Sequence, residues 1–135
     1  MQNCISEYKL EKKVFLKGTT NNVKKVLSEA DIFVLSSDYE GMPNALMEAL
    51  AVGVPSVSTD CPCGGPKMLI SNGENGLLVP VNDLNKMVEM LDYLFVHKVE
   101  KDEMGKLAKE RSYAFHPEKI ITEWKLYINS IIDKK

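Results

Sequence analysis

Short apolar runs alternate with amphipathic stretches along the first 80 residues of the chain. The runs at residues 14–16, 32–35 and 76–79 contain β-branched and aromatic side chains, which are typical of buried strands, and residues 55–58 complete a set of four predicted strands. Helical spacing predicts one helix over residues 2–10 and a second that begins at a cap, Asn21 or Asn22, and ends at residue 29. A short helical turn is predicted over residues 67–70. This alternation of strands and helices predicts an α/β fold with a parallel sheet.

After residue 80 the pattern becomes helical. Asp83 is expected to cap a helix whose apolar residues form a continuous stripe. A second helix is expected to begin at Asp102 and to end at about residue 114. A third is expected over residues 118–132, with Trp124 and Tyr127 on its apolar side. The sequence therefore predicts a helical C-terminal segment.

The stretch over residues 40–55 holds the predicted central helix. Pro43 stands where a helix can begin, and Leu46, Ala49 and Leu50 follow at the spacing of a core-facing stripe. Met42, the expected N-cap, has no side-chain oxygen to accept from the first-turn N–H groups. Those N–H groups are therefore free to meet a ligand, and the helix dipole favours an anion there.

Two glutamates bracket the start of this predicted helix. Glu40 lies in the loop ahead of it and Glu48 projects from its second turn, at the carboxyl end of a parallel strand, where open α/β sheets bind ligands. One carboxylate can accept hydrogen bonds from sugar hydroxyls and the other from a ribose, with a phosphate between them. Alone, such a pair is more often a solvated helix face than a binding site, so the surrounding motif decides its meaning.

Composition excludes several classes of function. The 135 residues fit one domain, and the formal net charge of −2 gives no basic surface for nucleic acid. No apolar run approaches the roughly 18–20 residues of a membrane span, and Met1 opens no signal-peptide pattern. Three cysteines without zinc-site spacing suggest a reducing cytosol, and His97 and His116 are expected at helix ends rather than in catalysis.

The succession of motifs resembles a known family. A strand, a Ser-Ser loop, Glu-Gly-x-Pro, a second glutamate, Ala-x-Gly-x-Pro and a new strand resemble the nucleotide-sugar-binding half of GT-B glycosyltransferases, particularly family 4. Residues 14–18 look like the strand before the base-recognition loop, residues 60–66 resemble the Gly-Gly loop of capsule and lipopolysaccharide sugar transferases, and residues 72–80 resemble the last turn and strand. The resemblance identifies residues 1–135 as a partial C-terminal, donor-binding domain.

The resemblance implies a Rossmann-like parallel sheet with helices on both faces, truncated at its N-terminal end because two β-α units and an acceptor domain are absent. It also implies retaining transfer of the hexosyltransferase type, from a UDP-sugar to a glycan or lipid-linked acceptor in surface polysaccharide synthesis. By the same resemblance Glu40 is catalytic, and the donor contacts are Gly41, Met42, Pro43, Asn44, Ala45, Glu48, Gly18, Thr19, Thr20 and Lys25.

Further expectations concern partners and place. No metal or other cofactor is expected, because the sequence has no Asp-x-Asp motif and the fold's chemistry is metal-independent. The resemblance places the complete protein in the cytoplasm, peripherally at the inner membrane face. The isolated chain is expected to be inactive and, with a truncated sheet, prone to self-association.

Two departures from the family pattern leave alternatives open. Met68 stands where the family usually carries a glutamate, and the Arg and Lys that clamp the diphosphate are missing, with Lys24, Lys25 and Lys67 the nearest basic candidates. The chain could instead belong to a GT-B nucleotide-sugar epimerase, be a non-catalytic nucleotide-binding module, or be a fragment without function. A product assay separates transfer from epimerisation.

Overall fold

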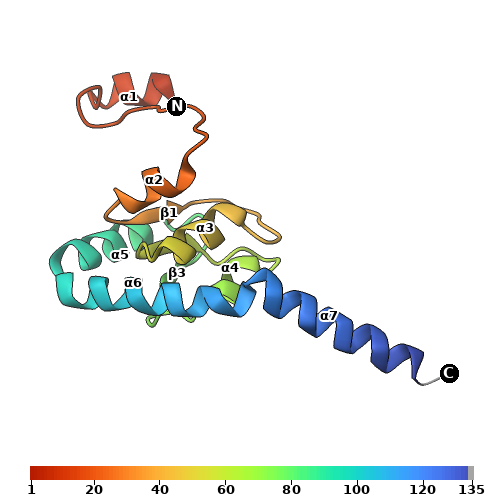
Figure 1. Cartoon of the computed structure of the whole chain (residues 1–135). Coiled ribbons are helices and arrows are strands. Elements are labelled where there is room, and N and C mark those ends of the chain that lie inside the picture. Colours follow the sequence, from red (N-terminus) through yellow and green to blue (C-terminus); the bar gives the residue numbers. More distant parts are fainter. Residues whose placement is uncertain (134–135) are drawn as a thin grey trace.

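Three parallel strands form the centre of the computed structural model, which describes residues 1–133 (Figure 1). Their order is β1-β2-β3, and Val57 in the middle strand lies opposite Val34 on one side and Leu77 on the other. The strands are β1 (Phe33–Leu35), β2 (Ser56–Thr59) and β3 (Leu77–Val79). The predicted α/β class, the parallel pairing and the truncated sheet are confirmed.

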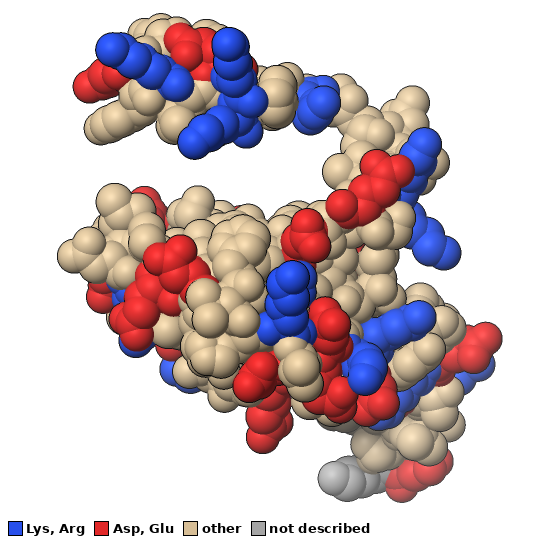
Figure 2. Space-filling view, turned by 90° about the vertical axis from the view of Figure 1, so that its left-hand side faces the viewer, with Lys and Arg blue, Asp and Glu red and all other residues tan. Residues whose placement is uncertain are grey.

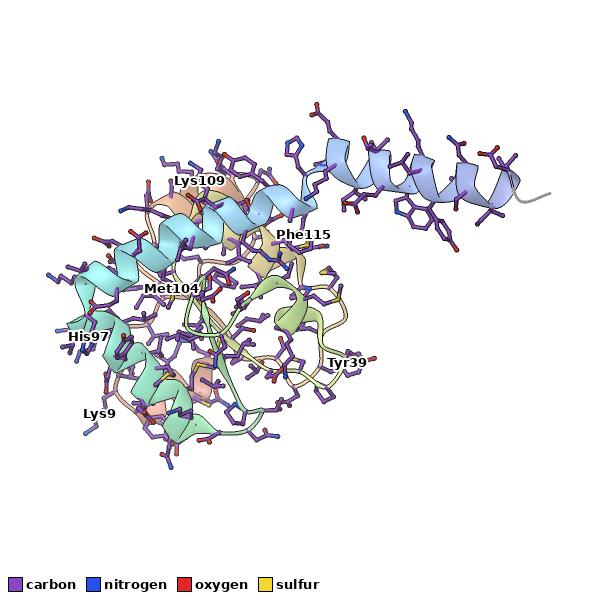
Figure 3. The ribbon with its side chains drawn as sticks, turned by 90° about the horizontal axis from the view of Figure 1, so that it is seen from below. Lys9, Tyr39, His97, Met104, Lys109 and Phe115 are labelled. Carbon is purple, nitrogen blue, oxygen red and sulfur yellow. The ribbon has the colours of Figure 1, made fainter. Side chains whose placement is uncertain are left out.

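Helices cover both faces of this sheet, as predicted. On one face lie α3 (Asn44–Val52) and α4 (Gly65–Leu69), and on the other lies α5 (Leu84–Val96). The long helix α6 (Lys98–Ser112) contributes to the core on each face of the sheet. Met104 (Figure 3) packs with the α5 side, and Ala108 packs with the α3 side. Burial of apolar side chains on both faces is the main term that holds the layers together.

Two predicted helix starts are confirmed in detail. The Asn22 side chain accepts from the Lys25 backbone N–H at 3.1 Å and opens α2 (Val23–Ser28), while Asp83 accepts from Lys86 at 2.9 Å and opens α5. Each cap satisfies one of the orphan N–H groups of a first helical turn. The predicted inner stripe of α3 is also correct, since its core-facing residues Leu46, Ala49 and Leu50 are buried.

Helices α3 and α6 approach each other through two glycines. Gly53 ends α3 in a left-handed conformation, with φ +90°. A Cβ on Gly105 would lie 2.5 Å from the Gly53 carbonyl oxygen, so no larger residue fits at this crossing of α6. The crossing brings Ala108 of α6 into the same buried cluster as Leu46 and Leu50.

The strand predicted at residues 14–16 is wrong. These residues form no strand, and Val14, Phe15 and Leu16 are exposed. A strand needs a neighbour for its backbone groups, and the described part of the chain offers none beside this segment. Together with α1 (Gln2–Glu7), which is shorter than predicted, the segment forms an N-terminal arm that stands away from the body (Figure 2).

Two helix boundaries also differ from prediction. Helix α3 begins at Asn44 with Pro43 as its N-cap, because the backbone of Pro43 is extended, with ψ 101°; the expected cap was Met42. Helix α6 begins at Lys98 rather than at Asp102, because the Lys101 N–H donates to the His97 carbonyl at 2.9 Å and continues the helical pattern upstream.

The C-terminal helix extends from the body (Figure 1). A short 3₁₀ turn, η1 (Tyr113–Phe115), leads into α7 (Pro117–Ile132), close to the predicted residues 118–132. None of the α7 residues is buried, so its predicted apolar side, with Trp124 and Tyr127, is open to solvent. His97 and His116 stand at helix ends, as predicted. Within residues 1–133 no helix combines the length and hydropathy needed to cross a bilayer.

Candidate functional site

The loop between β1 and α3 carries the first part of the candidate site. It runs over residues 36–43 from the carboxyl end of β1, and Glu40 lies half-buried near its end. Pro43 is buried, whereas Gly41, Met42, Asn44 and Ala45 are exposed around the start of α3. No side chain caps α3, so no side-chain oxygen accepts from its first-turn N–H groups.

The Glu40 carboxylate is held by a neighbour in the same loop. The Ser37 hydroxyl donates a hydrogen bond to Glu40 Oε1, with 2.9 Å between the two oxygens. Both side chains are partly buried, and a hydrogen bond to an ionised carboxylate is stronger than one between neutral groups. The carboxylate therefore has a fixed direction at the carboxyl end of the sheet.

Ser37 is in turn anchored by the end of β2 and the loop that follows it. Its carbonyl oxygen accepts from the Thr59 hydroxyl and, at 3.2 Å, from the Cys61 thiol, both of which are buried. At the surface, hydrogen bonding with the Cys63 thiol raises the pKa of Tyr39 above its ordinary value. The loops after β1 and β2 are thus coupled by side chains as well as by strand pairing.

A close backbone approach completes this loop pair. A Cβ built on Gly65, the first residue of α4, would overlap the carbonyl group of Gly41 and come within 3.1 Å of Pro43 Cδ. Only glycine at position 65 lets the segment from Gly41 to Pro43 lie against α4. The direction in which the chain enters α3 is therefore set by packing on α4.

Glu48 lies on α3, eight residues after Glu40, and is exposed. It lines a hollow of about 380 Å³ between α2 and α3, together with Val23, Lys24 and Leu27. It also borders an apolar hollow of about 430 Å³ that includes Phe115 of η1. Glu40 and Glu48 thus lie in different surroundings, the first in a hydrogen-bonded loop and the second at the rim of two hollows.

The remaining predicted donor contacts lie on the segment that leads into α2. Gly18, with φ +68°, and Thr19 and Thr20 are exposed, and Thr20 Oγ1 accepts from the Asn22 N–H at 3.1 Å. Lys25 is also exposed but is not among the residues that line the hollow beside Glu48. Its neighbour Lys24 does line that hollow.

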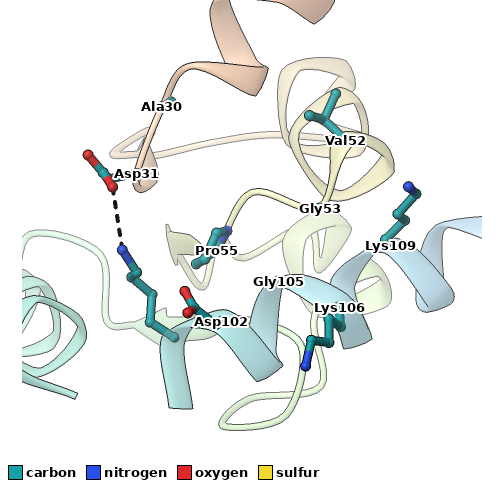
Figure 4. Close-up of a pocket in the computed structure, with 10 residues that line it drawn as sticks. Ala30, Asp31, Val52, Gly53, Pro55, Asp102, Gly105, Lys106 and Lys109 are labelled. Atoms are coloured by element: carbon teal, nitrogen blue, oxygen red, sulfur yellow. Dashed lines mark hydrogen bonds and ion pairs between the residues drawn. The ribbon is translucent and has the colours of Figure 1, made fainter. Parts of the chain in front are cut away.

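Other charged side chains form ion pairs or lie away from Glu40. Lys67 pairs with Asp60 at 2.8 Å, beside the loop that follows β2. Among residues 1–133 no three His, Cys, Asp or Glu side chains form a grouping suited to a metal ion. A hollow of about 410 Å³, shown in Figure 4, contains the Asp31–Lys101 pair at 3.5 Å, but it lies toward the amino ends of β1 and β2 and away from Glu40.

Three residues of this arrangement were missed by reasoning from the sequence. Ser37 stands only three residues before Glu40, in the same predicted loop, so their closeness could be seen in the sequence. Thr59 and Cys61 reach Ser37 across 22 and 24 residues of sequence, and no local pattern reports such a contact. Only the fold reveals their role.

The chain is similar to proteins that transfer sugars. Residues 1–111 match the family described as Glycosyl transferases group 1. An uncharacterized glycosyltransferase of Methanocaldococcus jannaschii is 34% identical over 98% of this chain and 39% of its own length. The UDP-Gal:alpha-D-GlcNAc-diphosphoundecaprenol alpha-1,3-galactosyltransferase of Escherichia coli is 29% identical over 98% of this chain and 34% of its own length.

A solved structure gives the same picture. The chain superposes with a TM-score of 0.85 on S. aureus TarM solved in complex with UDP, at 31% identity over 91% of this chain and 25% of that one. The chain spans roughly a quarter to two-fifths of the length of these proteins. Helix α7 lies beyond the residues that match the family, which end at 111.

Proposed function

Because the chain belongs to the glycosyl transferases group 1 family and has the architecture of the C-terminal domain of GT-B enzymes, we propose that it is the donor-binding part of a retaining glycosyltransferase. In this proposal it binds a UDP-sugar, and the complete protein transfers the sugar to a glycan or lipid-linked acceptor during surface polysaccharide synthesis. The proposal assigns residues 1–135 to a partial donor-binding domain.

One observation carries the proposal. Glu40 and Glu48 lie on either side of an uncapped helix N-terminus at the carboxyl end of β1, in a chain of this family. The N–H groups of the first turn of α3 and the helix dipole favour the diphosphate between the two acids. Glu40 then contacts the donor sugar, and Glu48 the ribose.

The reaction makes different demands on the two ends of this site. As the bond to the diphosphate breaks, positive charge develops at the anomeric carbon and negative charge grows on the leaving group. The fixed carboxylate of Glu40 stabilises the first, and the N–H groups around Asn44 and Ala45 stabilise the second. The exposed segment with Gly18, Thr19, Thr20 and Lys25 is assigned to the nucleotide end.

The relatives support the choice of donor and acceptor. The E. coli relative is named for UDP-Gal and a diphosphoundecaprenol-linked acceptor, and the TarM structure contains UDP. By the same reasoning we propose that the complete protein works in the cytoplasm, at the inner face of the membrane where such acceptors are presented.

The test is a product assay on the native protein that carries these residues. It is incubated with UDP-glucose, UDP-galactose or UDP-N-acetylglucosamine and an undecaprenyl-diphosphate-linked sugar, and the products are separated. Transfer of the sugar with retained configuration, together with release of UDP, is the expected result. Release of free sugar epimerised at one carbon, without glycoside, would point to the epimerase instead. Binding of UDP without any turnover would indicate a non-catalytic nucleotide-binding module.

A further inference from the structure

The arrangement of hydrogen bonds around Glu40 carries an inference that rests on the proposed function. The Ser37 hydroxyl, 2.9 Å from Glu40 Oε1, is the protein partner of that carboxylate in the described structure. A free glutamate in a surface loop would sample several side-chain orientations, at an entropic cost when one is selected. A carboxylate that is already oriented avoids that cost at the moment of reaction.

Ser37 is itself unusually well fixed for a loop residue. Its carbonyl oxygen accepts two hydrogen bonds from buried donors, the Thr59 hydroxyl and the Cys61 thiol. Thr59 is the last residue of β2, the strand that pairs with β1, and Cys61 lies in the loop after it. The backbone of Ser37 is thereby tied to the sheet, and its hydroxyl is free to hold Glu40.

We propose that Ser37 is a positioning residue that sets the direction of the Glu40 carboxylate toward the donor sugar, through a chain of contacts that begins at Thr59 and Cys61. Ser37 acts through Glu40 and does not itself touch the reacting atoms. Its contribution therefore falls on the turnover step, in which the oriented carboxylate is used, rather than on donor affinity.

Kinetics of the native protein with a saturating UDP-sugar test this role. Ser37→Ala is expected to lower kcat about 10-fold, the scale of one hydrogen bond to a charged group, and to leave the donor KM within about twofold. Ser37→Thr, which keeps the hydroxyl, is expected to restore most of kcat. The matched control is Ser36→Ala, which removes an adjacent exposed hydroxyl that makes no hydrogen bond to Glu40, and it should leave kcat unchanged.

A double-variant comparison separates positioning from a general structural effect. In a Glu40→Ala background there is no carboxylate to orient, so Ser37→Ala should cause no further loss of kcat. If Ser37→Ala does not fold, as judged by thermal melting, Ser37→Cys provides the comparison with a weaker donor of similar size.

The outcomes distinguish this inference from the function on which it rests. If Glu40→Ala lowers kcat about 100-fold or more while Ser37→Ala keeps the wild-type kcat, positioning by Ser37 is wrong and the assignment of Glu40 stands. A loss from Ser37→Ala that persists in full without Glu40 would also overturn positioning. If Glu40→Ala itself keeps the wild-type kcat, both the proposed role of Glu40 and the inference fail.

Discussion

The carbonyl group of Gly41 lies where a side chain on Gly65 would have to stand. This contact fixes the distance between the loop that carries Glu40 and the first turn of α4. Because Gly41 directly follows Glu40, a movement of this contact also moves the carboxylate. The candidate site therefore depends on a residue that bears no side chain and lies outside the paired-glutamate motif.

Replacing that glycine should displace the loop. Gly65→Ala places a methyl group against the Gly41 carbonyl, and we expect a loss of about 1–3 kcal/mol in the free energy of unfolding, as for other overpacked sites. Urea unfolding followed by circular dichroism measures the change. The matched control is Gly41→Ala, since a Cβ there meets nothing within 4 Å and Gly41 does not have a positive φ. Equal stability of Gly65→Ala and wild type would contradict the packing described above.

The buried hydroxyl of Thr59 should matter for stability as well. Thr59→Val keeps the shape of the side chain but removes one of the two donors to the Ser37 carbonyl, and we expect a loss of about 1–2 kcal/mol in the free energy of unfolding. Thr122→Val on α7 is the control, because it also removes a hydroxyl that donates to a carbonyl, but at an exposed position. That control should stay within about 0.5 kcal/mol of wild type. A similar loss of stability in both variants would contradict a stabilising role for the hydrogen bond from Thr59 to the Ser37 carbonyl.

Substitution of the two glutamates should change different kinetic constants of the native protein. Glu40→Gln removes a charge close to the bond that breaks, so we expect kcat to fall about 100-fold or more with a smaller change in donor affinity. Glu48→Gln acts where only the ribose can reach it, and we expect mainly a rise in donor KM of roughly tenfold. Steady-state kinetics with varied UDP-sugar separate the two effects. Wild-type kinetics in both variants, or loss of chemistry at saturating donor from Glu48→Gln alone, would show that the roles are wrongly assigned.

The chain by itself should not turn over. In the proposed function it supplies one wall of an interdomain cleft, and positioning of both substrates carries much of the rate in group transfer. Without the expected diphosphate clamp, binding of UDP should be weak, about millimolar. Isothermal titration with UDP and a transfer assay on the same sample provide the measurement. Clear sugar transfer by these residues alone would refute the proposal of an incomplete domain.

The open edge of the sheet should promote self-association. In the described residues β1 pairs with β2 alone, and Val34 on β1 is 42% exposed. The N-terminal arm adds Phe15, which is 62% exposed. Unpaired strand edges beside apolar surface favour association, so sedimentation should show larger species as concentration rises, and Val34→Lys should reduce them. A sharp monomer at high concentration with a cooperative melt would count against this expectation.

Local patterns predicted those parts of the fold that local forces decide. The caps at Asn22 and Asp83 and the buried stripe of α3 depend on residues within a turn of one another, and they are found as predicted. The run over residues 14–16 has the composition of a strand, but a strand also needs a partner, and composition carries no information about one. The start of α6 was misplaced for a related reason, since Asp102 resembles a cap although the helix already runs through it.

The candidate site also has a part that local sequence predicts and a part that it does not. Glu40, Glu48 and the uncapped start of α3 could be recognised from a motif within 16 residues, although the cap proved to be Pro43. The support for the Glu40 loop comes from Thr59, Cys61 and Gly65, which are distant from it in sequence. Residues 60–66 are recognisable as a Gly-Gly loop, but that motif does not indicate which residues its members contact. Their contribution depends on the parallel pairing of β1 with β2, which only tertiary structure establishes.

Helix α7 has a consequence for the motions of the molecule. Its 16 residues include none that is buried, so tertiary contacts add little to the helix–coil equilibrium of an isolated segment of that length, which is marginal in water. The amide protons of α7 should therefore exchange with solvent through local opening, whereas those of β2, whose four residues are all buried, should exchange only when the whole body opens. The last helix is therefore expected to open without opening of the sheet that carries the site.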